Sequence, residues 1–108
     1  MLRIYEVVIA LIALLAPVAE EIEKRDVKLG RQMKEAMASV ALNTAEGAGN
    51  IGGHKRQRYQ SVRGSALEVK ACIDVALAMR YIGPVDPAAL DMLDHVIAVM
   101  TKLTHRRR

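Results

Sequence analysis

The stretch LGRQMKEAMASVALNTAEGAGNIGGHKRQRYQSVRGSALEVKACIDVALAMRYI, from Leu29 to Ile82, decides the fold. It contains two long runs with helical periodicity, joined by a glycine-rich and basic connection. In the first run the apolar residues of one helix face are Leu29, Met33, Met37 and Val40. The chain lacks Trp and Phe and contains no alternating β-branched or aromatic run, so we predict an all-α protein.

Polar residues interrupt both runs at positions where core residues are expected. The first run has a second stripe, made of Gln32, Ala36, Ser39, Asn43 and Glu46. The seam predicted for the second run is Ser61, Ser65, Glu68, Cys72, Val75, Met79 and Ile82. Polar groups are costly to bury without partners. We therefore predict a hydrogen-bonded network that sets helix register, formed by Gln32, Ser39, Asn43, Glu46, Ser65 and Glu68.

The connection contains four glycines that are expected to end the first helix, because glycine readily adopts the left-handed conformation found at helix ends. They are Gly47, Gly49, Gly52 and Gly53. Residues 47–52 also match the dinucleotide-binding pattern GxGxxG. That pattern requires a preceding strand. A helix precedes it here, so no nucleotide cofactor is predicted.

N-terminal to this stretch, residues 2–25 are apolar on nearly every side of the expected helix. Such a helix must be buried all round. A membrane span is disfavoured because the apolar run 7–19 is too short. A secretory signal peptide is a second alternative, which the continuation of the apolar stripe to Ile22 argues against. We favour burial partly inside the subunit and partly between subunits, with Pro17 kinking or dividing the helix near Ala13.

The remaining helix boundaries have clear signals. Asp26 is a plausible N-cap for the helix that follows it, Gly83-Pro84 is expected to end the third helix, and Asp86-Pro87 is expected to start the fourth. Short connections imply antiparallel neighbours. We predict one domain over residues 1–108, an antiparallel up-down-up-down four-helix bundle with helices at about 2–25, 27–48, 55–82 and 87–105.

Basic residues gather at one end of this predicted bundle. Residues 54–108 carry ten Lys/Arg and five Asp/Glu, whereas residues 1–53 carry six and seven. The topology places together a set that we name the basic pole: His54, Lys55, Arg56, Arg58, Arg63, Arg106, Arg107 and Arg108. We expect acidic residues at the opposite end. Lys and Arg beside a helix N-terminus suit the phosphates of RNA or DNA.

No constellation points to catalysis or metal binding. Cys72 is the only cysteine, which excludes an internal disulfide and fits a cytoplasmic protein. Glu46 and Glu68 are expected to approach each other, but neither begins the Glu-x-x-His motif of di-iron bundles. We therefore predict no enzyme activity, metal or cofactor.

A longer pattern supports the fold. The segments LGRQ at 29–32, SVALNTAEG at 39–47 and RGSALEV at 63–69 are followed by Tyr81, Ile82 and Gly83. Together they resemble the four-helix-bundle family of ribosomal RNA intervening sequences. Thr44 and Tyr59 depart from the family pattern, which usually has an aliphatic residue and Phe there.

The resemblance implies a left-handed antiparallel bundle that assembles as a homopentamer. It also implies a distant relationship to accessory variability proteins of diversity-generating retroelements, which bind nucleic acid and a reverse transcriptase. The family has no established activity for most members. From the residues and the resemblance together we hypothesise a non-enzymatic oligomeric scaffold that binds RNA or DNA. The alternative is a protein–protein interaction module without a nucleic-acid role.

Overall fold

Helical periodicity in the sequence becomes four helices in the structure. The computed structural model describes residues 3–49 and 52–105. It contains α1 (Ile4–Arg25), α2 (Val27–Gly49), α3 (Gly52–Ala78) and α4 (Pro87–Thr104). Those residues form no strand.

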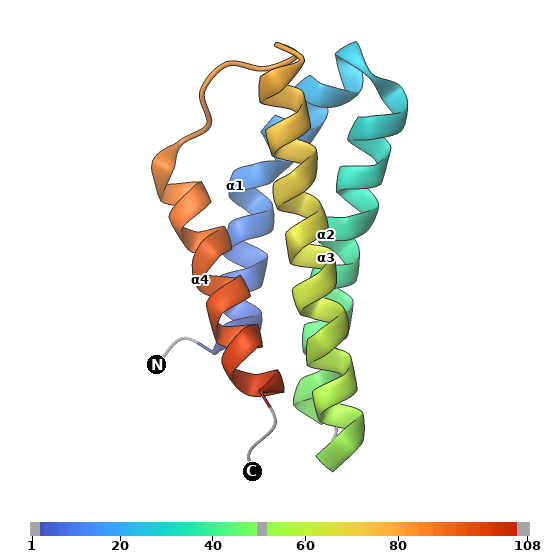
Figure 1. Ribbon diagram of the computed structural model, residues 1–108, viewed down its shortest axis with the longest axis vertical. Coiled ribbons are helices and arrows are strands. Elements are labelled where there is room, and N and C mark those ends of the chain that lie inside the picture. Colours follow the sequence, from blue (N-terminus) through green and yellow to red (C-terminus); the bar gives the residue numbers. More distant parts are fainter. Residues whose placement is uncertain (1–2, 50–51, 106–108) are drawn as a thin grey trace.

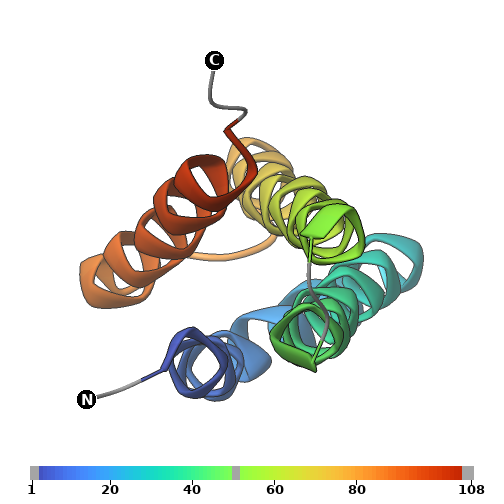
Figure 2. The same ribbon diagram turned by 90° about the horizontal axis from the view of Figure 1, so that it is seen from below.

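The helices run alternately up and down and form a bundle (Figure 1). Contacts join α1 to α2, α2 to α3, α3 to α4, and α4 to α1, so each helix packs against its neighbours in a ring of four. Figure 2, seen along the bundle, places α1 and α3 at opposite corners. The predicted antiparallel four-helix bundle is confirmed.

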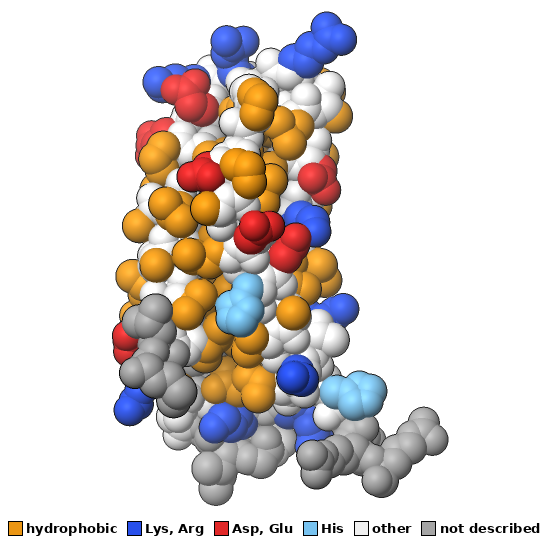
Figure 3. All heavy atoms as spheres, turned by 90° about the vertical axis from the view of Figure 1, so that its left-hand side faces the viewer, with side chains coloured by type: hydrophobic (Ala, Val, Ile, Leu, Met, Phe, Trp, Pro, Cys, Tyr) orange, Lys and Arg blue, Asp and Glu red, His pale blue; other side chains and the backbone are white. Residues whose placement is uncertain are grey.

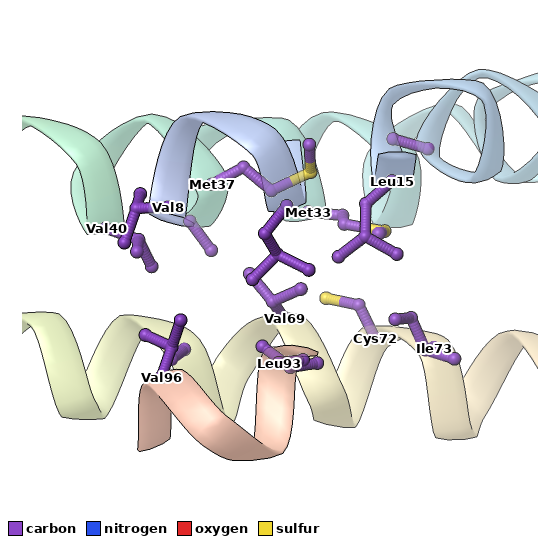
Figure 4. Close-up of a cluster of buried hydrophobic side chains, with 14 of the residues drawn as sticks. Val8, Leu15, Met33, Met37, Val40, Val69, Cys72, Ile73, Leu93 and Val96 are labelled. Atoms are coloured by element: carbon purple, nitrogen blue, oxygen red, sulfur yellow. The ribbon is translucent and has the colours of Figure 1, made fainter. Parts of the chain in front are cut away.

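The core consists of aliphatic and sulfur-containing side chains contributed by every helix, together with the ring of Tyr59 (Figure 4). Leu15 of α1, Met33 of α2, Ile73 of α3 and Leu93 of α4 are at most 1% exposed. Each such side chain contributes about 1.5–3 kcal/mol through removal of its apolar surface from water. Cys72 is also buried, and burial raises the pKa of its thiol, with a smaller contribution from Glu68.

The two aspartates predicted as N-caps both form caps. The backbone N–H of Leu29 donates to Asp26 Oδ1 at 3.0 Å, and the Tyr81 hydroxyl donates to the other carboxylate oxygen at 3.4 Å. At the start of α4 the backbone N–H of Ala88 donates to Asp86 Oδ1 at 2.9 Å, with Pro87 as the first helical residue. Local sequence chemistry therefore determines both helix starts.

Several predicted details of the helices are wrong. Pro17 does not divide α1 near Ala13, because the helix is continuous from Ile4 to Arg25, whereas a kink at Pro17, the other predicted outcome, stays a prediction. α3 begins at Gly52 instead of residue 55 and ends at Ala78 instead of Ile82. Its end is set by Arg80, which adopts the left-handed conformation with φ 62°.

Two backbone hydrogen bonds close this end of α3. The N–H of Arg80 donates to the Leu77 carbonyl at 3.1 Å, and the N–H of Tyr81 donates to the Ala76 carbonyl at 2.9 Å. This is the pairing that usually accompanies a glycine at a helix C-terminus. An arginine occupies that position here, which is why the sequence pointed to Gly83-Pro84 instead.

The predicted seam of α3 does not coincide with its buried face. Val75 and Met79 are 46% and 58% exposed, and the buried residues are Tyr59, Val62, Ala66, Val69, Cys72, Ile73 and Ala76. α3 has two apolar stripes, and the periodicity of the sequence alone does not distinguish the one that faces the core.

Candidate nucleic-acid interface

The basic pole is built where α3 begins. His54, Lys55, Arg56 and Arg58 occupy the first two turns of α3, and Arg63 lies about one turn further on. The C-terminal ends of α2 and α4 and the N-terminal end of α1 lie at the same end of the bundle (Figure 1). Arg106, Arg107 and Arg108, also predicted for this pole, lie outside the described residues.

Neutral partners hold two of these arginines against the neighbouring helices. Arg63 donates from Nε to Thr101 Oγ1 at 2.8 Å, which ties α3 to α4. Arg58 donates from Nη1 to Asn43 Oδ1 at 3.3 Å, which ties α3 to α2. Lys55 Nζ lies 6.0 Å from the centre of the Tyr59 ring. Each cation is thereby oriented without being neutralised.

Three lysines elsewhere in the described part of the bundle, Lys24, Lys34 and Lys70, are paired with carboxylates. Lys34 bridges Glu20 and Glu23 at 2.8 Å each, and Lys70 pairs with Asp94 at 2.8 Å. Their hydrogen bonds and charges lower the pKa of Glu20 and raise those of Lys34 and Lys70. Within residues 3–49 and 52–105, no such ion pair involves a cation of the basic pole.

The position of these cations on α3 is unfavourable for folding. A helix N-terminus carries a partial positive charge, so a nearby cation destabilises the helix. The four residues His54, Lys55, Arg56 and Arg58 follow the start of α3, whereas a helix N-terminus usually favours Asp or Glu. An anion bound at this end would relieve the repulsion between these cations and the helix dipole. It would also accept hydrogen bonds from backbone N–H groups.

Three of the six residues predicted for the polar network, Ser39, Asn43 and Ser65, are joined by hydrogen bonds between α2 and α3. The hydroxyls of Ser39 and Ser65 lie 2.8 Å apart, and Asn43 Nδ2 donates to the Ser39 carbonyl at 3.0 Å and to its hydroxyl at 3.1 Å. Because Asn43 also accepts from Arg58, this part of the network reaches the basic pole.

The carboxylates do not form the predicted pair. Gln32 donates to Glu68 Oε2 at 3.2 Å, in an exposed contact separate from the serines. Glu46 is an exposed residue fourteen positions beyond Gln32 on α2, a rise of about 21 Å along the helix. The expectation that Glu46 and Glu68 approach each other is therefore wrong.

The opposite end of the molecule is mixed in charge, contrary to the acidic end that we expected. Lys24 and Arg25 end α1, and Lys28 and Arg80 lie near them, alongside Glu20, Glu21, Glu23, Asp26, Asp86 and Asp91. Figure 3 shows Lys and Arg together with Asp and Glu at its upper end. Near that end Lys24 pairs with Glu21 and Lys34 with Glu20 and Glu23, whereas no ion pair among the described residues involves Arg25, Lys28 or Arg80.

Two groups in this region were not predicted from the sequence. Thr101 fixes Arg63, and Lys102 follows it on α4, in the last turn of that helix. A cation in the last turn has an ordinary role in stabilising the helix end. The sequence held no signal that Thr101 would meet Arg63, because 38 residues separate them.

Neither a cluster of metal-binding side chains nor a membrane-spanning helix occurs in the described part of the chain. No group of three or more His, Cys, Asp or Glu residues there could hold a metal ion. No described helix is both long and apolar enough to cross a membrane. Comparisons with protein-family models, curated proteins and solved structures find no match to this chain.

Proposed function

We propose that this protein is a non-enzymatic, oligomeric scaffold that binds the phosphate backbone of RNA or DNA through the basic pole. The observation that carries the proposal is the contrast in pairing. Lys34 and Lys70 have carboxylate partners, whereas Arg58 and Arg63 are oriented by neutral side chains. Charges that are oriented and uncompensated suit an external anion.

A polymer that carries many phosphates fits the basic pole better than a small anion does. Its cations extend over three turns of α3, and a nucleic-acid backbone presents a phosphate every few ångströms. Arg58 and Arg63 face the neighbouring helices on either side, α2 and α4, so the pole spans the end of the bundle. Such contacts position a backbone without reading its sequence.

Fluorescence anisotropy with labelled duplex RNA at low salt tests this proposal. The variant with Lys55→Ala, Arg56→Ala and Arg58→Ala is expected to bind at least about tenfold more weakly than the unmodified protein. The matched control carries Lys24→Ala, Arg25→Ala and Lys28→Ala, which remove the same charge from the opposite end. Equal weakening by both variants, or no binding by the unmodified protein, would overturn the proposal.

The oligomer is supported by two unpartnered apolar faces. α1 carries no charged residue between Glu6 and Glu20, and its Ile9 and Leu14 are 44% and 43% exposed. Apolar side chains cover much of the side formed by α1 and α4 (Figure 3). On the solvent-facing side of α3 an apolar stripe runs through Gly64, Leu67, Ala71, Val75 and Ala78, all exposed.

These two faces differ and lie on helices at opposite corners of the bundle (Figure 2). Joining the α1 face of one copy to the α3 face of the next gives a head-to-tail interface, which closes into a ring when the rotation permits. The resemblance to the intervening-sequence family, which is itself part of this proposal, suggests that the ring contains five copies. A ring would also place several basic poles together and multiply their weak individual contacts.

Light scattering measures the assembly directly. We expect a mass well above the 11.9 kDa of one chain, and a single-chain mass for Ile9→Glu or Ala71→Glu, because either change places a charge in the interface. Leu42→Glu is the control, because Leu42 is an exposed residue of α2 that belongs to neither apolar face, and this variant should retain the assembly. A mass of one chain for the unmodified protein at micromolar concentration would refute the oligomer.

A protein–protein interaction module is the second candidate, because the same apolar faces also suit a different protein. The resemblance suggests a reverse transcriptase as one such partner. This alternative predicts an unmodified protein that stays a single chain and binds no RNA at any salt concentration. The two measurements above therefore distinguish the two candidates.

A further inference from the structure

The outer surface of α4 has a shallow hollow that the basic pole does not account for. Its volume is about 570 Å³, within the range of small-molecule sites. The described lining residues belong to the second half of α4 or follow its end: His95, Ala98, Val99, Thr101, Lys102 and His105.

The lining combines an apolar floor with a polar, basic rim. Ala98 and Val99 provide the floor, and His95, Lys102 and His105 provide two imidazoles and an ammonium group. None of the described residues that line the hollow is a carboxylate. Asp94, which adjoins it on α4, is paired with Lys70 at 2.8 Å.

The hollow adjoins the basic pole through one hydrogen bond. Thr101 lines the hollow and also accepts from Arg63 Nε at 2.8 Å, which holds a guanidinium group at its edge. The same threonine hydroxyl donates to the Ile97 carbonyl at 2.8 Å, and that of Thr104 donates to the Met100 carbonyl at 2.8 Å. The Thr104 hydroxyl also lies 3.2 Å from the carbonyl of Thr101, one of the last four carbonyls of α4, which have no backbone partner within the helix.

We propose that this hollow holds one unpaired nucleotide of the nucleic acid bound at the basic pole. A nucleotide combines a flat base, which can lie on Ala98 and Val99 beside an imidazole, with a phosphate for Lys102 and Arg63. A base inside a duplex is stacked and paired, and cannot enter. The inference rests on the proposed function and adds a preference for single strands.

The test compares a short oligouridine with a blunt duplex RNA of equal phosphate number, by anisotropy at one salt concentration. Ala98→Glu, a change at an exposed position, fills the hollow. It is expected to weaken oligouridine binding at least about fivefold more than duplex binding, the loss of one stacked base. Ala45→Glu adds the same charge on α2, at the basic end and outside the hollow, and should weaken both ligands equally.

A second readout does not depend on the pole residues His54, Lys55, Arg56 and Arg58 at the start of α3. Uridine monophosphate should shift the imidazole proton resonances of His95 and His105 in the unmodified protein, and should not do so in Ala98→Glu. One result would overturn the nucleotide site and leave the proposed function standing. It is salt-dependent duplex binding together with a ratio of oligouridine affinity to duplex affinity that is unchanged in Ala98→Glu. Absence of all RNA binding would overturn both.

Discussion

Gly47 of α2 lies against the ring of Tyr59 on α3. A Cβ at residue 47 would stand 2.5 Å from Tyr59 Cε1, and both residues are buried. The sequence suggested that this glycine ends the helix. Instead Gly47 lies within α2, where its missing side chain makes room for an aromatic ring. Local turn chemistry was visible in the sequence, whereas a contact with a residue on another helix was not.

Gly47→Ala should therefore destabilise the protein. Overpacking against Tyr59 costs about 1–3 kcal/mol, which exceeds the gain of roughly 1 kcal/mol in helix propensity. Gly53→Ala is the control, because a Cβ there meets nothing within 4 Å and residue 53 lies in the first turn of α3, outside the proposed subunit interface. Urea unfolding at one protein concentration measures both. Equal stabilisation by the two changes would contradict the close packing of Gly47 and Tyr59.

At the scale of elements, helix starts were more predictable than helix ends. Asp26 and Asp86 act through hydrogen bonds to residues two or three positions away, so their role is written in the local sequence. The end of α3 depends on Arg80, which adopts a conformation that favours glycine and that no residue pattern predicts for an arginine. Which stripe of α3 is buried depends on its neighbours, and the periodicity could not settle that choice.

The N-cap of α4 provides a test at this scale. Asp86→Ala removes the acceptor of the Ala88 N–H and should lower the free energy of unfolding by about 1 kcal/mol. Asp91→Ala, at an exposed position within α4, removes the same charge without removing a cap and should change stability by less than about 0.5 kcal/mol. Thermal unfolding followed by circular dichroism compares them. Similar losses in both variants would indicate a charge effect instead of a cap.

For the whole molecule, the four-helix topology followed from the sequence because short connections permit few arrangements of four amphipathic helices. The convergence of the cations on α3 at one end also followed from that topology. The sequence could not show which cations are paired, since Lys34 meets Glu20 and Glu23, and Arg63 meets Thr101, only after folding. The proposed site depends on that difference.

The central claim is that the cations at the start of α3 bind nucleic-acid phosphates. Its most direct test is the affinity for duplex RNA measured across a salt series, because each phosphate contact adds about 0.7–0.9 to the slope of log K against log salt. We predict a steep slope for the unmodified protein, reduced by about 2–3 in the Lys55, Arg56 and Arg58→Ala variant. An affinity independent of salt, or a slope unchanged in that variant, would contradict the account.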